Sequence, residues 1–241
     1  MNSHRTITLI ALLCLGAAAS SFAQQNHDEL KQRVLTQAQS LGPNDYAFTR
    51  TVRTESTSNG KTEKKVVVEK FDPTKPANAR WTLVSVGGAP PSAEELKRHQ
   101  KEAAKRRIVP GYYRVAAYFG APATGSSESG RTVFRFPTLP KGAVSVLDTD
   151  VSQNATAEAS VTDANGVPYV EQVRFTVKPM RIKLLMKLDR FESTARYRID
   201  AGGKPVLVGA TSNLSGSGMG QEGTIHTAIT YSDYRAVGGE R

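Results

Sequence analysis

The feature that most constrains this fold is an alternation of apolar and polar residues with a period of two, which starts at Tyr46. Tyr46 and Phe48 lie on one face of the first predicted strand. Asn59-Gly60 follows, a dipeptide typical of a two-residue hairpin turn, and predicts a second strand at about 64–71. A third strand is predicted at 80–86. Because alternate side chains point to opposite faces of a strand, these segments predict an antiparallel meander with one apolar face.

The same alternation returns at Arg131 and continues to the C-terminus. Asn165-Gly166 and Gly202-Gly203 predict two more hairpins. The longest predicted strand is Arg181–Tyr197, and the last is Thr224–Tyr234. We therefore predict a mainly β (α+β) fold: a curved antiparallel sheet, or incomplete β-barrel, with a few covering helices.

Helical spacing is confined to short segments. Apolar residues recur at helical intervals over His27–Leu41, and Tyr112–Phe119 has a short helical pattern. Ser92 and Glu95 match a capping box that starts a helix ending at about Arg107. Gly and Ser dominate 120–130, which predicts a flexible surface loop. We expect one domain over residues 24–241, with a helical insertion at about 92–119.

Residues 1–23 have the pattern of a secretory signal peptide. A short basic start, an apolar run and a small-x-small site ending at Ala23 predict cleavage there and a periplasmic location. The only cysteine, Cys14, is lost with this segment, so disulfides and thiolate metal sites are excluded. The net charge of +10 then favours anionic partners in the envelope rather than nucleic acid, which that compartment excludes.

No motif predicts catalysis, a cofactor or a metal site. Residues 218–223 match G-x-G-x-x-G, but a strand is predicted to follow, whereas a dinucleotide site needs a helix. His27, His99 and His226 lack metal-ligand spacing and are expected to face solvent. Asp148 and Asp150 would suit a cation site or a hydrolytic carboxylate pair, but a turn-capping role is favoured. We therefore expect a protein that is not an enzyme.

A basic ridge is predicted on the helix after Ser92, where Lys97, Lys101 and Lys105 recur at intervals of four residues. Ion pairs of Glu94 with Arg98 and of Glu102 with Arg106 are expected to offset their repulsion. Each lysine would contribute about 1 kcal/mol near an anionic membrane surface. The ridge is therefore either a transient docking site for an anionic membrane or envelope polymer, or an ordinary solvated helix face.

The larger apolar side chains of the predicted sheet allow two interpretations. They either fill the core or line an apolar cavity. The candidates for a cavity wall include the lone tryptophan and are Tyr46, Phe48, Trp81, Leu83, Phe134, Phe136, Leu184 and Met186.

Four short segments carry a resemblance to a known family: Phe71-Asp72-Pro73, Pro76–Leu83, Pro179–Ile182 and Tyr231–Tyr234. In these four segments and in the order of its predicted elements, the chain resembles the LolA/LolB-like superfamily of periplasmic lipoprotein carriers. The resemblance implies an incomplete antiparallel barrel, closed on one side by helices, around an apolar cavity that holds acyl chains. It implies a non-enzymatic carrier or sensor whose partner is the acyl chain of a lipid or lipoprotein. The alternative is a protein–protein or anionic-polymer binding module with a filled core.

Overall fold

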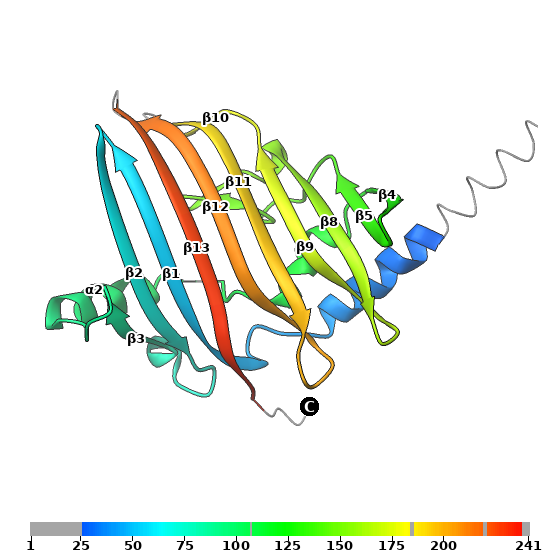
Figure 1. Ribbon diagram of the computed structural model, residues 1–241, viewed down its shortest axis with the longest axis horizontal. Coiled ribbons are helices and arrows are strands. Elements are labelled where there is room, and N and C mark those ends of the chain that lie inside the picture. The colour runs from blue at the N-terminus through cyan, green and yellow to red at the C-terminus, as the bar shows by residue number, and fades with distance from the viewer. Residues whose placement is uncertain (1–25, 107, 184–185, 219–220, 238–241) are drawn as a thin grey trace, which may run out of the picture.

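The fold is dominated by one antiparallel sheet of eleven strands (Figure 1). The computed structural model describes residues 26–106, 108–183, 186–218 and 221–237. The strand order is β3-β2-β1-β13-β12-β11-β9-β8-β5-β4, with β10 paired to β11, and the end strands β3 and β4 do not pair with each other. The prediction of an open, curved antiparallel sheet with few helices is therefore confirmed.

The strands of this sheet have the following bounds: β1 Tyr46–Ser58, β2 Lys61–Phe71, β3 Trp81–Val86, β4 Thr124–Glu128, β5 Arg131–Phe136, β8 Ala155–Ala164, β9 Val167–Val177, β10 Met180–Lys183, β11 Met186–Ile199, β12 Pro205–Gly218 and β13 Gln221–Ala236. A small second sheet pairs β6 Ser145–Val146 with β7 Thr149–Asp150. The helical elements are residues 26–39, η1 Ala77–Ala79, α2 Ala93–Ala103, η2 Tyr112–Val115, α3 Ala116–Phe119 and η3 Ser152–Asn154.

The predicted hairpin turns are confirmed. Ser58 pairs with Lys61 across Asn59-Gly60, and Ala164 pairs with Val167 across Asn165-Gly166. All four turn residues have positive φ, which asparagine and glycine adopt more readily than other residues. Gly202-Gly203 likewise lies in the connection between β11 and β12.

Two predicted segments are wrong. Arg181–Tyr197 is not one strand, because the chain reverses and Lys183 pairs with Met186, which separates β10 from β11. The predicted loop at 120–130 contains β4, which pairs with β5 from Thr124 to Glu128. A polar strand at the edge of a sheet needs no apolar face, so its composition resembles that of a loop.

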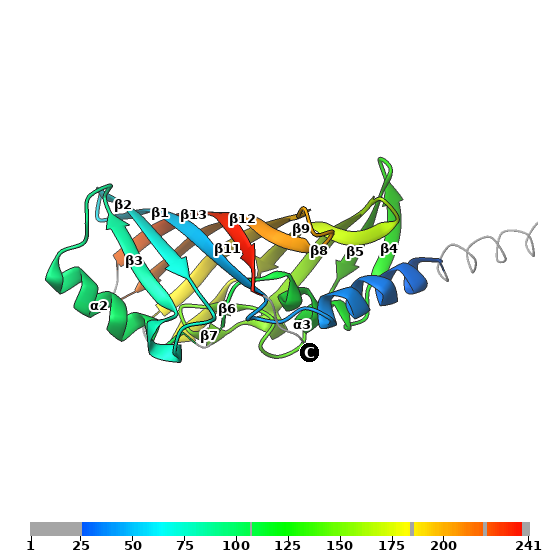
Figure 2. The ribbon, with the colours of Figure 1, turned by 90° about the horizontal axis from the view of Figure 1, so that it is seen from below.

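The sheet curves around the helices, which lie on one side of it (Figure 2). We call this side the inner face. Val34 and Ala38 of the N-terminal helix are fully buried, and Phe119 of α3 packs against Phe134 and Phe136 of β5. Helix α2 lies at the opposite end of the sheet, beside β3 (Figure 2). Within the described ranges, no helix is long and apolar enough to cross a membrane.

Candidate functional site: the inner face of the sheet

The middle of the inner face is uncharged and only partly covered. Phe48 packs against Trp81 and Phe71 on this face, so alternation places Val52, Thr54 and Ser56 of β1 on it as well. These residues pair with Ile225, Thr227 and Ile229 of β13, which in turn pair with Ala210, Ser212 and Leu214 of β12, so all of them share this face. We call these nine residues the row. All nine residues are half-buried rather than buried. The helices therefore leave this part of the face accessible.

An apolar pocket lies at the end of this row, near the hairpin between β1 and β2. Its volume is about 260 Å³. Its apolar lining residues come from four strands and the β6–β7 turn: Leu147, Ile182, Met186, Leu188, Leu214 and Ile225. Two larger hollows, of about 490 and 480 Å³, are lined mostly by polar or charged residues. The smaller pocket is therefore the better candidate for an apolar ligand.

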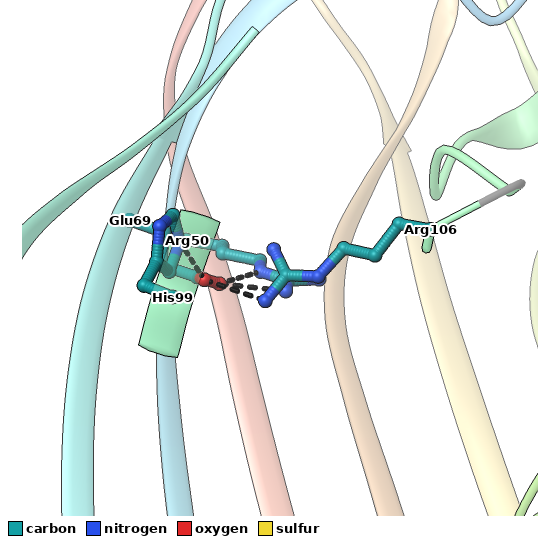
Figure 3. Close-up of polar contacts among 4 residues, drawn as sticks. All are labelled: Arg50, Glu69, His99 and Arg106. Atoms are coloured by element: carbon teal, nitrogen blue, oxygen red, sulfur yellow. Dashed lines mark hydrogen bonds and ion pairs between the residues drawn. The ribbon is translucent and has the colours of Figure 1, made fainter. Parts of the chain in front are cut away.

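A buried charged cluster lies at the other end of the row, centred on the carboxylate of Glu69 in β2 (Figure 3). The Glu69 side chain is only 2% exposed. Arg50 Nη2 lies 2.6 Å from Oε2, and Arg106 Nη2 donates to Oε1 at 2.8 Å. His99 Nε2, from α2, lies 2.6 Å from the same Oε1. We call these four residues the Glu69 cluster.

The two arginines determine the ionisation of Glu69. Burial by itself would raise the pKa of the carboxyl, but the attraction and hydrogen bonds of Arg50 and Arg106 lower it below its ordinary value. Glu69 is therefore a carboxylate at neutral pH. Breaking such a buried pair is costly, because the remaining charge stays buried without a partner.

Trp81 packs beneath both guanidinium groups. The Arg50 and Arg106 guanidinium carbons lie 4.3 and 4.9 Å from its ring centroid, within cation–π distance. Trp81 is 9% exposed and also contacts Phe71 at 5.0 Å between ring centroids. The tryptophan thus joins the Glu69 cluster to the aromatic core.

The predicted cavity residues fall in three places. Tyr46, Phe48, Trp81 and Leu83 lie around β1 and β3, where Phe48 contacts Trp81 and Tyr46 donates to Asp200. Phe134 and Phe136 pack against α3 on the same face, toward the opposite end of the sheet. Met186 lines the apolar pocket, and Leu184 lies outside the described residues. The two aromatic groups are closely packed, so the open apolar space is at the pocket and along the row leading to it.

The basic ridge differs in part from its prediction. Lys97, Lys101 and Lys105 are exposed, but α2 ends at Ala103, so Lys105 follows the helix. Glu102 pairs with Lys105 rather than with Arg106. The prediction of a Glu102–Arg106 pair is wrong because Arg106 reaches Glu69. The capping box of Ser92 and Glu95 is confirmed.

The three histidines also differ from one another. His226 is exposed as predicted, but His99 is buried against Glu69, so its predicted solvent exposure is wrong. His27 is half-buried, with its ring edge-on to Phe134. A buried carboxylate on the sheet attracts His99 inward from a helix face that looks polar in the sequence.

The other predicted motifs have structural roles. Asp150 accepts hydrogen bonds from the Gly142 and Ser152 amides, which confirms its turn-capping role, and Asp148 is exposed. Residues 218–223 connect β12 to β13 with Gly218 paired to Gln221, so a strand follows the glycines as predicted; residues 219–220 lie outside the described chain.

The sequence analysis did not predict the Glu69 cluster, although the alternation of apolar and polar residues in β1 and β2 indicates part of it. Arg50 shares the face of Phe48, and Glu69 shares the face of Phe71, so two opposite charges fall on the apolar face of neighbouring strands. Charged residues are almost never fully buried unless they are paired. That combination would have predicted the Arg50–Glu69 pair, but not the contributions from residues 99 and 106.

No protein-family model matches the chain, and no curated protein matches it. Among solved structures, it is similar to a LolA superfamily protein from Nitrosomonas europaea, with 12% identity, a TM-score of 0.36 and coverage of 88% of this chain and 94% of the other. A DUF1329 family protein from Desulfovibrio piger matches with 12% identity, a TM-score of 0.36 and coverage of 90% and 95%. An outer membrane lipoprotein-sorting protein domain from Vibrio parahaemolyticus matches with 13% identity, a TM-score of 0.35 and coverage of 88% and 95%.

At these scores the matches assign no ligand to this chain. The expected resemblance is confirmed to this extent: structures of the LolA superfamily and of a lipoprotein-sorting domain are among those that the chain resembles.

Proposed function

We propose that this protein is a non-enzymatic binding protein of the cell envelope that shelters an acyl chain of a lipid or lipoprotein on the inner face of its sheet. The observation that carries the proposal is the uncharged, half-buried row on β1, β13 and β12, which continues into an apolar pocket of about 260 Å³. Sheltering a chain from water contributes about 0.8 kcal/mol per methylene. Ten sheltered methylenes would thus contribute roughly 8 kcal/mol before the costs of association.

The side chains along the row favour a slender, flexible ligand. Ala210 and Ser212 have short side chains that leave space above β12, whereas the longer apolar side chains of Leu214 and Ile225 line the pocket. Four of the nine residues of the row carry a hydroxyl, five are apolar and none is charged. A face of apolar and small uncharged side chains suits an acyl chain better than a charged ligand.

The location proposed for this activity is the periplasm, after secretion across the inner membrane and cleavage near Ala23. The sequence pattern of residues 1–23 supports it. Cell fractionation followed by N-terminal sequencing tests this part, with Gln24 as the expected first residue. Recovery of the uncleaved chain in the cytosol would contradict it.

The basic ridge supports a second, compatible role in transient docking to an anionic membrane or envelope polymer. Lys97 and Lys101 are exposed on α2 and Lys105 is exposed just after it; the same helix contributes His99 to the Glu69 cluster. Replacing all three with glutamine is expected to abolish salt-sensitive binding to anionic vesicles while leaving acyl-chain binding unchanged. Unchanged vesicle binding would leave the ridge as an ordinary solvated surface.

The main proposal is tested by blocking the row with one bulky side chain. In Ser212→Trp the indole would occupy the inner face, whereas Thr211→Trp places the same group on the opposite, exposed face of β12. We expect Ser212→Trp to lose binding of a fluorescent fatty acid and Thr211→Trp to retain it, with both variants folded by circular dichroism. Equal binding by both variants would contradict the proposal, as would a wild-type protein that binds no fatty acid and yields no lipid on solvent extraction.

A further inference from the structure

The Glu69 cluster contains more positive charge than its carboxylate neutralises. Arg50 and Arg106 both contact Glu69, so the cluster has an excess of one positive charge even with a neutral His99. Each arginine has five N–H donors in a planar group that suits carboxylate and phosphate. The cluster can therefore attract one further anion.

Arg106 has the donor that this anion would use. Among the described residues, its Nη1 atom is buried and has no hydrogen-bond partner, while Nη2 is engaged by Glu69. A buried donor without an acceptor is unfavourable. A ligand that supplies an acceptor removes this cost, and its binding free energy becomes more favourable. The Arg106 side chain is 25% exposed, compared with 14% for Arg50, 8% for His99 and 2% for Glu69, so Arg106 is the most accessible member of the cluster.

We propose that Arg106, supported by Arg50, binds the acidic headgroup of an amphiphile, a carboxylate or phosphate, whose acyl chain extends along the inner face to the apolar pocket. This inference rests on the proposed function and adds the headgroup chemistry of the ligand. It also assigns the headgroup to the end of the row at the Glu69 cluster and the tail to the end at the apolar pocket.

The spacing along β1 agrees with this orientation. Arg50 and Ser56 lie on the same face, six residues apart, and Ser56 lines the pocket. At about 3.3 Å per residue they are separated by roughly 20 Å. One leaflet of a bilayer has an apolar thickness of about 15 Å, half of the ~30 Å hydrocarbon core. An acyl chain of this length covers about three quarters of the distance, and the headgroup at the cluster covers part of the remainder.

The described inner-facing positions of β1, β13 and β12 along this path carry no acid; the acids that flank it are Glu63, opposite Ser56 on β2, and Glu222 at the pocket. Between the level of Arg50 and the pocket, the inner-facing residues of β1, β13 and β12 are Val, Thr, Ile, Ala and Ser. These side chains offer neither a counter-ion for Arg106 nor a charge that would repel the ligand. The contrast between a cationic end and an uncharged row is the pattern that an acidic amphiphile would complement.

The test compares hexadecanoic acid with its methyl ester, as competitors that displace the uncharged dye Nile red. For the wild-type protein we expect the acid to bind at least about tenfold more tightly than the ester, the difference expected for one charge-assisted hydrogen bond. Arg106→Gln should weaken acid binding about tenfold and leave ester binding unchanged. Arg98→Gln, an exposed arginine on α2, is the matched control and should change neither.

Each other outcome would overturn the inference. Equal binding of acid and ester by the wild type, or equal weakening of both by Arg106→Gln, contradicts the headgroup site while leaving the proposed function intact. Absence of binding of either ligand contradicts the proposed function and this inference with it. Inorganic phosphate is the third arm: if it displaces the acid at an affinity equal to that of the acid, the cluster binds a free anion rather than a headgroup. If Arg106→Gln does not fold, Arg106→Lys replaces it in the test, because lysine retains the positive charge. Arg106→Lys should keep part of the preference for the acid over the ester.

Discussion

Arg106 donates a hydrogen bond of 2.8 Å to the carboxylate of Glu69, although the two residues are 37 positions apart in the chain. The contact joins the segment after α2 to strand β2. His99 makes a second connection from α2 to the same carboxylate. The attachment of this helical segment to the sheet therefore depends on one buried acid.

Replacing Glu69 with glutamine should destabilise the fold by about 3–5 kcal/mol, because two arginines would lose their counter-ion. Glu55→Gln is the control, since Glu55 forms an exposed pair with Lys64 and its removal should cost less than about 1 kcal/mol. Urea unfolding followed by circular dichroism measures both values. Equal effects of the two substitutions would show that the buried pair has no special role.

Stability should also decrease in acid because of Glu69. The pKa of Glu69 is lowered in the folded protein, so its contribution is complete above its ordinary value of 4.5 and is lost as pH falls below 4.5 through the lowered folded value. Unfolding free energies measured from pH 6 to pH 3 should decline less for Glu69→Gln than for the wild type. Parallel pH profiles would contradict this assignment.

Trp81 and Arg106 should be energetically coupled, because the guanidinium lies over the indole ring. In a double-mutant cycle of Trp81→Leu and Arg106→Gln, we expect a coupling free energy of about 0.5–2 kcal/mol. Thermal or urea unfolding of the two single variants and the double variant provides the measurement. Strictly additive effects would mean that the contact contributes nothing to stability.

Gly216 should tolerate no side chain. A Cβ there would overlap the backbone carbonyl of Lys187, which cannot move aside as a flexible side chain would. Gly216→Ala is expected to cost more than about 1 kcal/mol. Gly209→Ala, on the same strand, meets only an ordinary contact with the Ile229 carbonyl and should be neutral or slightly stabilising. A similar melting temperature for both variants would contradict this difference.

The period-two pattern was sufficient to predict the sheet and its tight hairpins, because each depends on local sequence. Asn59-Gly60 and Asn165-Gly166 determine their turns regardless of the rest of the chain. The reversal between Lys183 and Met186 was missed because apolar alternation continues across it. A turn without Gly, Pro, Asn or Asp has no such local signal.

The charged cluster depends on contacts between distant segments. Spacing within a helix predicted that Arg106 would pair with Glu102, but α2 ends before Arg106 and frees it to reach β2. The environment of His99 is likewise determined by a strand that precedes α2 by many residues. Sequence periodicity assigns residues to faces, but it does not show which faces meet.

We propose an acyl chain that lies along the inner face, with its acidic end at Arg106 and its tail in the pocket. The most direct test uses a fatty acid with a photoreactive diazirine at its tail, followed by peptide mass spectrometry to locate the cross-links. We expect cross-links to pocket residues such as Met186, Leu214 and Ile225, which are lost when unlabelled fatty acid competes. Cross-links to the opposite face of the sheet, at residues such as Thr211 or Asn213, or labelling that competitor does not reduce, would contradict it.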